Sequence, residues 1–163
     1  MTGWIGIDPG ATGAIAIIWG DTDVDIHDWP GDERALDSLL IRIADSCTVE
    51  CAVLEYQQAM PGQGVTSMFK LGVNYGMWLS AIAARQWPLK IVRPSCWKKG
   101  FGYPPKEKAD GKQHSLTLAR QMYPQAARLL ARKKDHNRAE ALLLAHYAKE
   151  GKFEIEDEED FLR

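Results

Sequence analysis

The sequence has no long hydrophobic run and few cysteines. No apolar stretch among its 163 residues approaches the ~18 residues that a membrane-spanning helix requires. The first residues do not form a basic region followed by an apolar core, so no secretory signal is predicted. The three cysteines, Cys47, Cys51 and Cys96, match no zinc-ligand spacing and are typical of thiols in a reducing compartment. These absences predict a cytoplasmic protein without a membrane partner.

The chain also has no internal repeats and no segment with the composition of a domain linker. Its length fits one domain that is large enough to bury a real core. We therefore expect a single domain over residues 1–153, followed by an acidic C-terminal tail over residues 154–163.

Charge is distributed unevenly along the chain, although the net charge is only −2. Residues 1–60 contain eleven acidic and two basic residues, whereas residues 61–153 contain five acidic and seventeen basic residues. The tail contains six acidic residues and one basic residue. An ordinary mixed surface is one interpretation. The other is that the basic span contacts phosphates, and that the tail is disordered or screens this span when no nucleic acid is bound.

Hydrophobic periodicity predicts an α/β fold. Short apolar runs predict strands over residues 3–8, 13–19, 23–29, 51–55 and 91–92. Apolar residues at helical spacing predict helices over residues 32–46, 65–86, 113–122 and 137–149, and residues 100–111 are typical of an exposed loop. A helix between two strands favours parallel pairing of those strands. The order predicts a five-stranded mixed sheet with helices on both faces.

Three acidic residues occur where a folded chain brings functional groups together. Asp8 ends the first strand, Glu55 ends the fourth, and Glu140 lies in a helical segment. In α/β sheets, functional groups gather at the strand ends, and a helix docked against that edge can bring Glu140 to the same point. Such oxygen ligands favour magnesium or manganese, and two ions about 4 Å apart assist hydrolysis of a phosphodiester. The pattern therefore predicts a divalent-metal site.

Each candidate also has a simpler interpretation. Asp8 precedes Pro-Gly and is typical of a turn residue. Glu55 is compatible with an edge carboxylate that accepts a hydrogen bond from a backbone amide. His136 stands four residues before Glu140 and shares a helix face with it, but it is equally typical of an ordinary residue at a helix N-terminus. All three simple interpretations would have to hold at once in a chain whose middle is basic, which weakens them relative to a metal site.

Four segments point to a known family. They are WIGIDPGATGAIAI, LEYQQAMPGQGVTSMFKLGVNYGMW, VRPSCWKK and KKDHNRAEALLLAHY. Their order resembles that of the motifs of RuvC-type Holliday junction resolvases, and most closely the branch that contains phage enzymes and the plant chloroplast resolvase. The resemblance spans about residues 3–149. It implies an RNase H-like fold and a homodimer that nicks two opposed strands of a four-way DNA junction, with two Mg²⁺ or Mn²⁺ ions per site. A phage-encoded member would act in the host cytoplasm.

The resemblance assigns Asp8 and Glu55 to the first two acidic positions of the family and Glu140 to the last. Family members place Asp or His three or four residues before the last carboxylate. Here His136 stands four before it, Asn137 three before it and Asp135 five before it. We favour His136, as a metal ligand or as a base for the attacking water, and Asp135 remains the alternative ligand.

The resemblance also implies contacts to DNA. Lys98 matches a lysine that lies beside the active site in this family, where an ammonium stabilises charge on the scissile phosphate; an ordinary surface lysine is the alternative. Gln57, Gln58, Met60 and Gln63 match residues that approach the junction core. Candidates for contacts to the DNA backbone are Lys99, Lys106, Lys108, Lys112, Arg132, Lys133 and Lys134. Any one of these can instead be an ordinary solvated base.

The helix expected over residues 65–86 has two possible uses. Phe69 either stacks on an unpaired base or packs in the core with its helical neighbours. Gly72, Gly76 and Ser80 would allow another helix to approach closely, so this helix is the candidate dimer interface, and packing within one chain is the alternative. The same segment contains the larger residues Met68, Leu71, Tyr75, Met77 and Trp78.

Other functions compete with junction cleavage. An ATP-binding phosphotransferase of the actin and sugar-kinase type also has a glycine-bearing loop after a strand-end aspartate, but it needs two such domains. A junction-binding protein without catalysis is disfavoured because all the acidic positions are occupied. A nuclease that acts on forks or flaps is a narrower alternative. We expect no small-molecule substrate.

Overall fold

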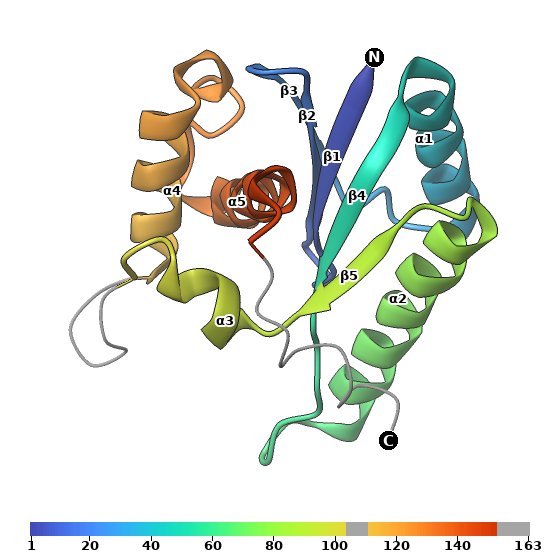
Figure 1. The fold of residues 1–163 in the computed structure, drawn as a ribbon. Coiled ribbons are helices and arrows are strands. Elements are labelled where there is room, and N and C mark those ends of the chain that lie inside the picture. The colour runs from blue at the N-terminus through green and yellow to red at the C-terminus, as the bar shows by residue number, and fades with distance from the viewer. Residues whose placement is uncertain (104–110, 153–163) are drawn as a thin grey trace.

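A five-stranded mixed sheet forms the centre of the molecule, described here from a computed structural model over residues 1–103 and 111–152. The strands are β1 (Thr2–Asp8), β2 (Ala14–Trp19), β3 (Asp23–Asp28), β4 (Thr48–Glu55) and β5 (Leu89–Val92). Their order is β3-β2-β1-β4-β5, with β2 antiparallel to β1 and β3, and with β1, β4 and β5 parallel (Figure 1). The predicted five-stranded mixed sheet is confirmed.

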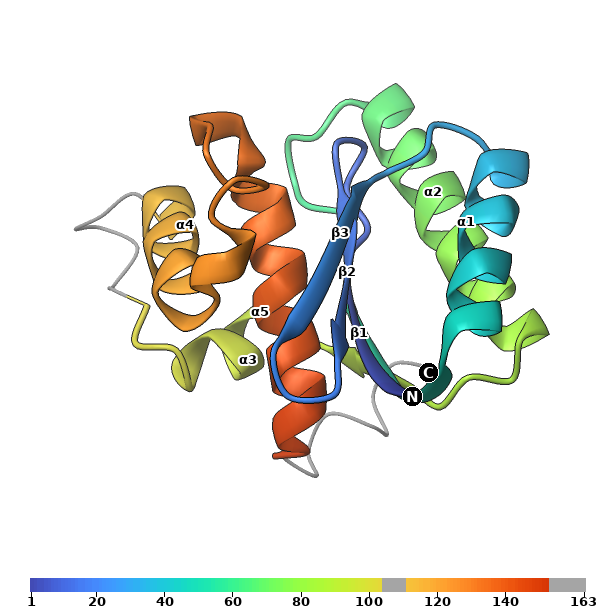
Figure 2. The same cartoon turned by 90° about the horizontal axis from the view of Figure 1, so that it is seen from above.

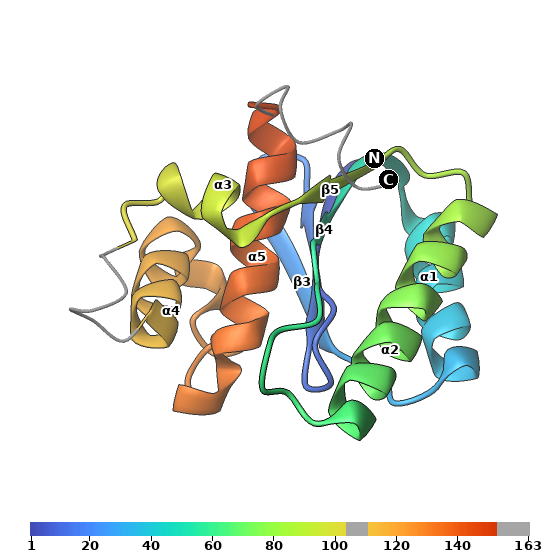
Figure 3. The same ribbon diagram turned by 90° about the horizontal axis from the view of Figure 1, so that it is seen from below.

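Helices cover both faces of this sheet, as expected. One face packs against α1 (Glu33–Ser46) and α2 (Val65–Ala84), which lie side by side in Figures 1 and 3. The other face packs against α5 (His136–Glu150), and α4 (Gly111–Met122) lies outside α5 (Figure 2). Each face has its own hydrophobic core, so the sheet is buried on both sides.

Strand β1 lets α5 approach the sheet closely because of one glycine. A Cβ atom built on Gly6 would overlap the backbone of α5 at Ala141 and Ala145. The neighbouring strand presents Ala14 and Ala16 to the same layer, and these side chains are small. The small residues on this face therefore set how near α5 lies to the ends of β1 and β4, where the acidic residues are found.

Most of the predicted elements are present, but one short helix is not predictable from the pattern. The helix α3 (Pro94–Lys99) follows β5 and has six residues, which is too few to show helical periodicity. Its start is marked only by Pro94, a residue that suits the first helical position. Two 3₁₀ turns, Pro124–Ala126 and Lys133–Asp135, lie within the segment between α4 and α5.

Some of the expectations concern residues that the structure does not describe. Lys106, Lys108 and the acidic tail over residues 154–163 lie outside the described ranges. Within residues 1–103 and 111–152, none of the helices combines the length and the apolar character needed to cross a lipid bilayer.

Candidate active site

Asp8 and Glu55 lie next to each other at the edge where the parallel strands end. Asp8 is the last residue of β1, Glu55 is the last of β4, and Ile7 pairs with Leu54 between these strands. Both acidic residues are buried, with exposed fractions of 8% and 7%. Helix α5 packs on the same strands, and Glu140 is near enough for its charge to act on both carboxylates. The structure thus brings the three predicted acids together.

Burial and mutual repulsion raise the pKa values of the two strand-end acids. For Asp8 the pKa rises to about 6, chiefly because the carboxylate is desolvated and secondly because Glu140 is negatively charged. For Glu55 the pKa rises to about 7, again chiefly through desolvation and then through the charge of Asp8. Lys98 opposes both shifts. The site is therefore short of positive charge, which a bound cation can supply.

Glu55 is oriented by two side-chain donors. The indole Nε1 of Trp97, a fully buried residue of α3, donates to Glu55 Oε2 at 2.8 Å. The amide Nε2 of Gln57 approaches the other oxygen, Oε1, at 3.3 Å. Sequence reasoning selected Gln57 but missed Trp97, because the helix that positions the indole was not expected. The family motif VRPSCWKK contains this tryptophan and was the available signal.

Glu140 is held by a second set of partners. Its Oε1 lies 3.0 Å from Ser115 Oγ of α4 and 3.3 Å from Lys98 Nζ, and the single Ser115 hydroxyl hydrogen is shared between this oxygen and the Gly111 carbonyl at 2.9 Å. Ser115 is fully buried and also contacts Tyr103 Oη at 2.8 Å. The Lys98 ammonium lies over the rings of Trp97 and Tyr103, 5.0 and 5.2 Å from the ring centroids. Lys98 therefore lies within the site, as the resemblance implied, whereas Ser115 and Tyr103 were missed.

The loop between β1 and β2 is held from both helical layers. The Gly10 amide donates to Asp8 Oδ1 at 3.2 Å, so the loop contacts the carboxylate directly. Asn74 of α2 donates to the loop from one side, and Asn137 of α5 donates to Thr12 from the other. Asn74 was not recognised from the sequence, because nothing local marks an asparagine that bonds to a loop 64 and 65 residues away.

Asp135 and His136 occupy different environments. The Asp135 carboxylate accepts from the backbone amide of Arg132 at 2.8 Å and from its guanidinium at 2.7 Å, which closes the turn before α5. Burial raises the pKa of Asp135, but these hydrogen bonds outweigh it and leave the pKa below its usual value. His136 is the first residue of α5, and its ring lies 3.4 Å from the Lys133 carbonyl. Asp135 is thus already engaged, whereas the histidine ring makes one long contact.

The donor set fits a hard divalent cation, although the side chains are not gathered around one point. Over the described ranges, no group of three or more His, Cys, Asp and Glu side chains is arranged to hold a metal ion. The chemistry of the carboxylates nevertheless suits such an ion. Asp8 and Glu55 are buried oxygen donors whose raised pKa values reflect uncompensated negative charge. Asp8, Glu55 and Glu140 are the residues that could hold it.

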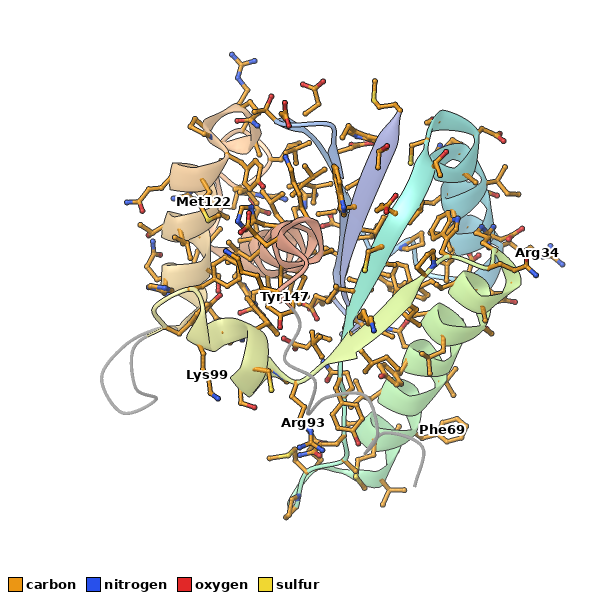
Figure 4. All side chains as sticks on the ribbon, viewed as in Figure 1. Arg34, Phe69, Arg93, Lys99, Met122 and Tyr147 are labelled. Atoms are coloured by element: carbon orange, nitrogen blue, oxygen red, sulfur yellow. The ribbon has the colours of Figure 1, made fainter. Side chains whose placement is uncertain are left out.

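Two clefts contain several of the predicted DNA contacts, and Glu55 lines one of them. One, of about 510 Å³, is lined by Glu55, Gln57, Gln58 and Met60 together with Arg93. The other, of about 540 Å³, includes Arg132, Lys134, His136 and Arg138 in its lining. Sequence reasoning missed Arg93 and Arg138. Figure 4 shows Arg93 beside the loop that follows β4.

The other predicted contacts are at the surface. Lys99 ends α3 and extends away from the ribbon in Figure 4, and Lys112 and Lys133 are exposed as well. Gln63 bonds within its own loop, where its Oε1 accepts from the Met60 amide at 3.2 Å.

Phe69 does not pack in the core. Its side chain is 72% exposed and projects outward from the N-terminal half of α2 (Figure 4). Val65 and Val73, one turn away on either side, are 79% and 43% exposed. The core interpretation of Phe69 is therefore wrong, because α2 turns a different stripe of residues toward the sheet.

Comparisons with known proteins agree with the motifs. No family model matches the chain. The chain is 32% identical over 95 residues to the chloroplastic Holliday junction resolvase MOC1 of Chlamydomonas reinhardtii. The matched region covers 58% of this chain but only 10% of MOC1, so the chain spans about a tenth of that curated relative.

Solved structures extend the likeness, in fold, to about nine-tenths of the chain. A structure of T. thermophilus RuvC in complex with Holliday junction substrate matches with a TM-score of 0.63 and 17% identity, over 93% of this chain and 98% of that chain. This chain has the RuvC fold. A second Thermus thermophilus RuvC structure matches with a TM-score of 0.50 and 18% identity, over 90% and 95% of the two chains. The RuvC fold confirms the predicted RNase H-like class, and the resemblance to RuvC-type resolvases is confirmed in sequence and fold.

Proposed function

We propose that this chain is a divalent-metal-dependent endonuclease that resolves four-way DNA junctions as a homodimer, by hydrolysing one phosphodiester in each of two opposed strands. The observation that supports this most strongly is the pair of buried acids, Asp8 and Glu55, at adjacent strand ends beneath Glu140. The RuvC fold and the similarity to MOC1 favour the same substrate. The ATP-binding and non-catalytic alternatives have no comparable support.

In this proposal the three carboxylates hold two Mg²⁺ ions, with Mn²⁺ as the alternative metal. When bound, such ions lower the pKa of a coordinated water and neutralise charge that develops on the phosphate. Trp97 and Gln57 fix the orientation of Glu55, and Ser115 does the same for Glu140. Trp97 and Ser115 are fully buried, so both contacts lie away from solvent.

Lys98 and His136 act on the reacting groups. The Lys98 ammonium is paired with Glu140 at 3.3 Å over two aromatic rings, and we propose that it stabilises negative charge on the scissile phosphate. His136 is proposed as the fourth ligand or as the base that orients the attacking water. Asp135 is the less favoured ligand, because Arg132 and a backbone amide already occupy its oxygens.

The two clefts are proposed to receive DNA. Arg132 and Lys134, which line one cleft, and the exposed Lys99, Lys112 and Lys133 are proposed to contact backbone phosphates, which gives affinity without sequence reading. Lys106 and Lys108 are proposed for the same role. The glutamines after β4 (Gln57, Gln58 and Gln63) are proposed to approach the junction core, where Phe69 stacks on an unpaired base.

A second copy is proposed to pack against α2. This helix has large exposed apolar side chains, and among the described residues a Cβ atom added to Gly72 or Gly76 would meet no atom within 4 Å. An exposed apolar face of this kind is typical of an interface between subunits. The single domain over residues 1–153, the acidic tail over residues 154–163 and the cytoplasmic location expected from the sequence remain predictions.

The test is incubation of the purified protein with an end-labelled four-way junction, a linear duplex of the same sequence, and a fork and a flap. Each substrate is tested with Mg²⁺, with Mn²⁺ and with EDTA. We expect symmetric nicks in the junction alone, and only when metal is present. Equal cleavage of forks or flaps would replace this proposal by that of a broader branched-DNA nuclease. Binding of ATP and Mg²⁺ without any cleavage would favour the phosphotransferase.

A further inference from the structure

Helix α2 has an unusual distribution of polar and apolar residues. Its buried stripe consists of Asn74, Trp78 and Ile82, whereas the apolar Phe69 and Val73 face outward. Asn74 is 6% exposed and is the one polar member of this stripe. Burial of an amide is unfavourable unless it forms hydrogen bonds, so this position is expected to have a specific partner.

The partner is the loop that follows Asp8. Asn74 Nδ2 donates to the Pro9 carbonyl at 2.7 Å and to the Gly10 carbonyl at 2.9 Å. An amide nitrogen has two N–H groups, and both are used. The orientation of the amide is determined by this geometry, because only the NH₂ group can face two carbonyl oxygens. Within the described part of the chain, the buried Oδ1 has no hydrogen-bond partner, so the contribution of this amide comes from its two donors.

The carbonyl groups that accept these bonds belong to the two residues that directly follow Asp8. The Gly10 amide donates to Asp8 Oδ1 at 3.2 Å, and the Gly10 carbonyl accepts from both Asn74 and the Gly13 amide. The turn is closely packed at Gly13, where a Cβ atom would overlap the backbone of Asp8 and Gly10, so only glycine fits there. Hydrogen bonds thus connect Asn74 of α2 through Gly10 to the Asp8 carboxylate.

We propose that Asn74 is a positioning residue that sets the Asp8 carboxylate for metal binding and links it to the α2 face. The link is short, because Val73, the residue before Asn74, is part of the exposed apolar face. A second copy that packs on α2 would restrain this helix, and Asn74 of the same helix bonds to the loop that follows Asp8. Metal binding and dimerisation are parts of the function proposed above, whereas the hydrogen bonds of Asn74 are observed in the structure.

The test compares Asn74→Leu with the wild-type protein. Leucine has nearly the same size and removes both the donors and the unpaired acceptor, so the fold is expected to survive. Asn74→Asp keeps the shape but places an acceptor against two carbonyls. The control is Gln125→Leu, which removes an amide that donates to the Thr22 carbonyl in the turn between β2 and β3, at the opposite end of the sheet. Asp8→Asn is the reference for a lost ligand.

The primary measurement is Mn²⁺ binding by the DNA-free protein, followed by electron paramagnetic resonance of the free ion. Loss of a supporting contact behind a metal ligand weakens affinity by about 10–100-fold, and we expect a loss in this range for Asn74→Leu. Gln125→Leu should bind as the wild type does. The melting temperature of each variant is measured as well, and junction nicking is measured over a series of Mn²⁺ concentrations. Excess Mn²⁺ should restore nicking by Asn74→Leu.

The outcomes separate this inference from the proposed function. Wild-type affinity in both folded Asn74 variants would overturn the positioning role, even if the protein cleaves junctions. A lower melting temperature with unchanged affinity would reduce Asn74 to a structural residue and would also overturn it. If Asn74→Leu binds Mn²⁺ more weakly than the wild type, and the wild-type protein cuts no junction, the inference is supported and the nuclease is rejected. A wild-type protein that binds no Mn²⁺ would overturn both.

Discussion

Trp97 Nε1 donates a 2.8 Å hydrogen bond to Glu55 Oε2, and this bond joins a short helix to the end of β4. Both residues are buried, so the bond is formed in a low-dielectric environment where it strongly restricts the carboxylate. The indole has a single N–H donor and no acceptor, so it can only donate to a carboxylate oxygen. Trp97 therefore orients an acid of the site without being able to bind a metal.

Trp97→Phe should lower junction nicking by about 10–100-fold, as expected when a hydrogen bond behind a metal ligand is lost. Phenylalanine fills most of the indole volume but donates nothing to Glu55. Single-turnover nicking at saturating Mg²⁺ measures the effect. The control is Trp4→Phe, because Trp4 is a residue of β1 that packs beside Lys149. Equal rates for the two variants would show that Glu55 does not depend on the indole.

Asp8→Asn and Glu55→Gln should each abolish junction nicking while leaving junction binding largely intact. Either change removes a charged oxygen ligand but keeps the size of the side chain, and the basic residues that bind phosphate are untouched. Nicking gels with Mg²⁺ and gel-shift titrations in EDTA provide the two measurements. Full nicking by either purified variant would reject the metal-site assignment.

The raised pKa values also predict how stability depends on pH. The pKa of Asp8 rises from 3.8 to about 6 on folding, and that of Glu55 rises from 4.5 to about 7. The folded state therefore binds protons more tightly at both residues. The protonated carboxyl groups of Asp8 and Glu55 therefore stabilise the folded state. This contribution to the free energy of unfolding is complete below about pH 4 and is lost as the pH rises through about 6 and 7.

This pH effect is measured by urea unfolding of Asp8→Asn and wild-type protein in EDTA. At pH 7.5 we expect Asp8→Asn to be more stable by about 1–3 kcal/mol, since a shift of one pKa unit corresponds to about 1.4 kcal/mol. The difference should vanish near pH 4, where the wild-type aspartate is protonated. Addition of Mn²⁺ should stabilise only the wild type. A difference that is independent of pH would contradict the burial argument.

Much of the fold follows from local sequence patterns. The apolar runs that end at Asp8 and Glu55 define two central strands, and the leucine spacing of α1 defines its buried face. The acids of the site were predictable because an ionisable group at the end of a buried strand is unusual. The partners were not, since Trp97, Ser115 and Asn74 meet these acids or their loop only through packing of distant elements. The burial of Asn74 even contradicts its local pattern, because apolar neighbours on the same helix are exposed.

The two candidates for the fourth ligand should behave differently. Asp135→Ala removes the carboxylate that closes the turn before α5, and loss of such a capping contact costs about 0.5–2 kcal/mol. His136→Ala removes a ring with one long contact, so it should leave stability unchanged and lower nicking sharply. Urea unfolding and nicking rates for both variants separate these effects. Equal activities would show that His136 is not the fourth group or that neither residue matters.

Gly76 gives a direct test of the dimer. Within the described residues, a Cβ atom added at this position meets no atom within 4 Å, so Gly76→Glu should not strain the fold. Removing a glycine from a helix interior also slightly favours the helix. A second copy packed on α2 would instead meet a buried charge, which is strongly unfavourable. Sedimentation should therefore show a dimer for the wild type and a monomer for Gly76→Glu, with no decrease in melting temperature at low protein concentration. A variant that remains dimeric would place the interface elsewhere, and a lower melting temperature in the monomer would mean that Gly76 is needed within one chain.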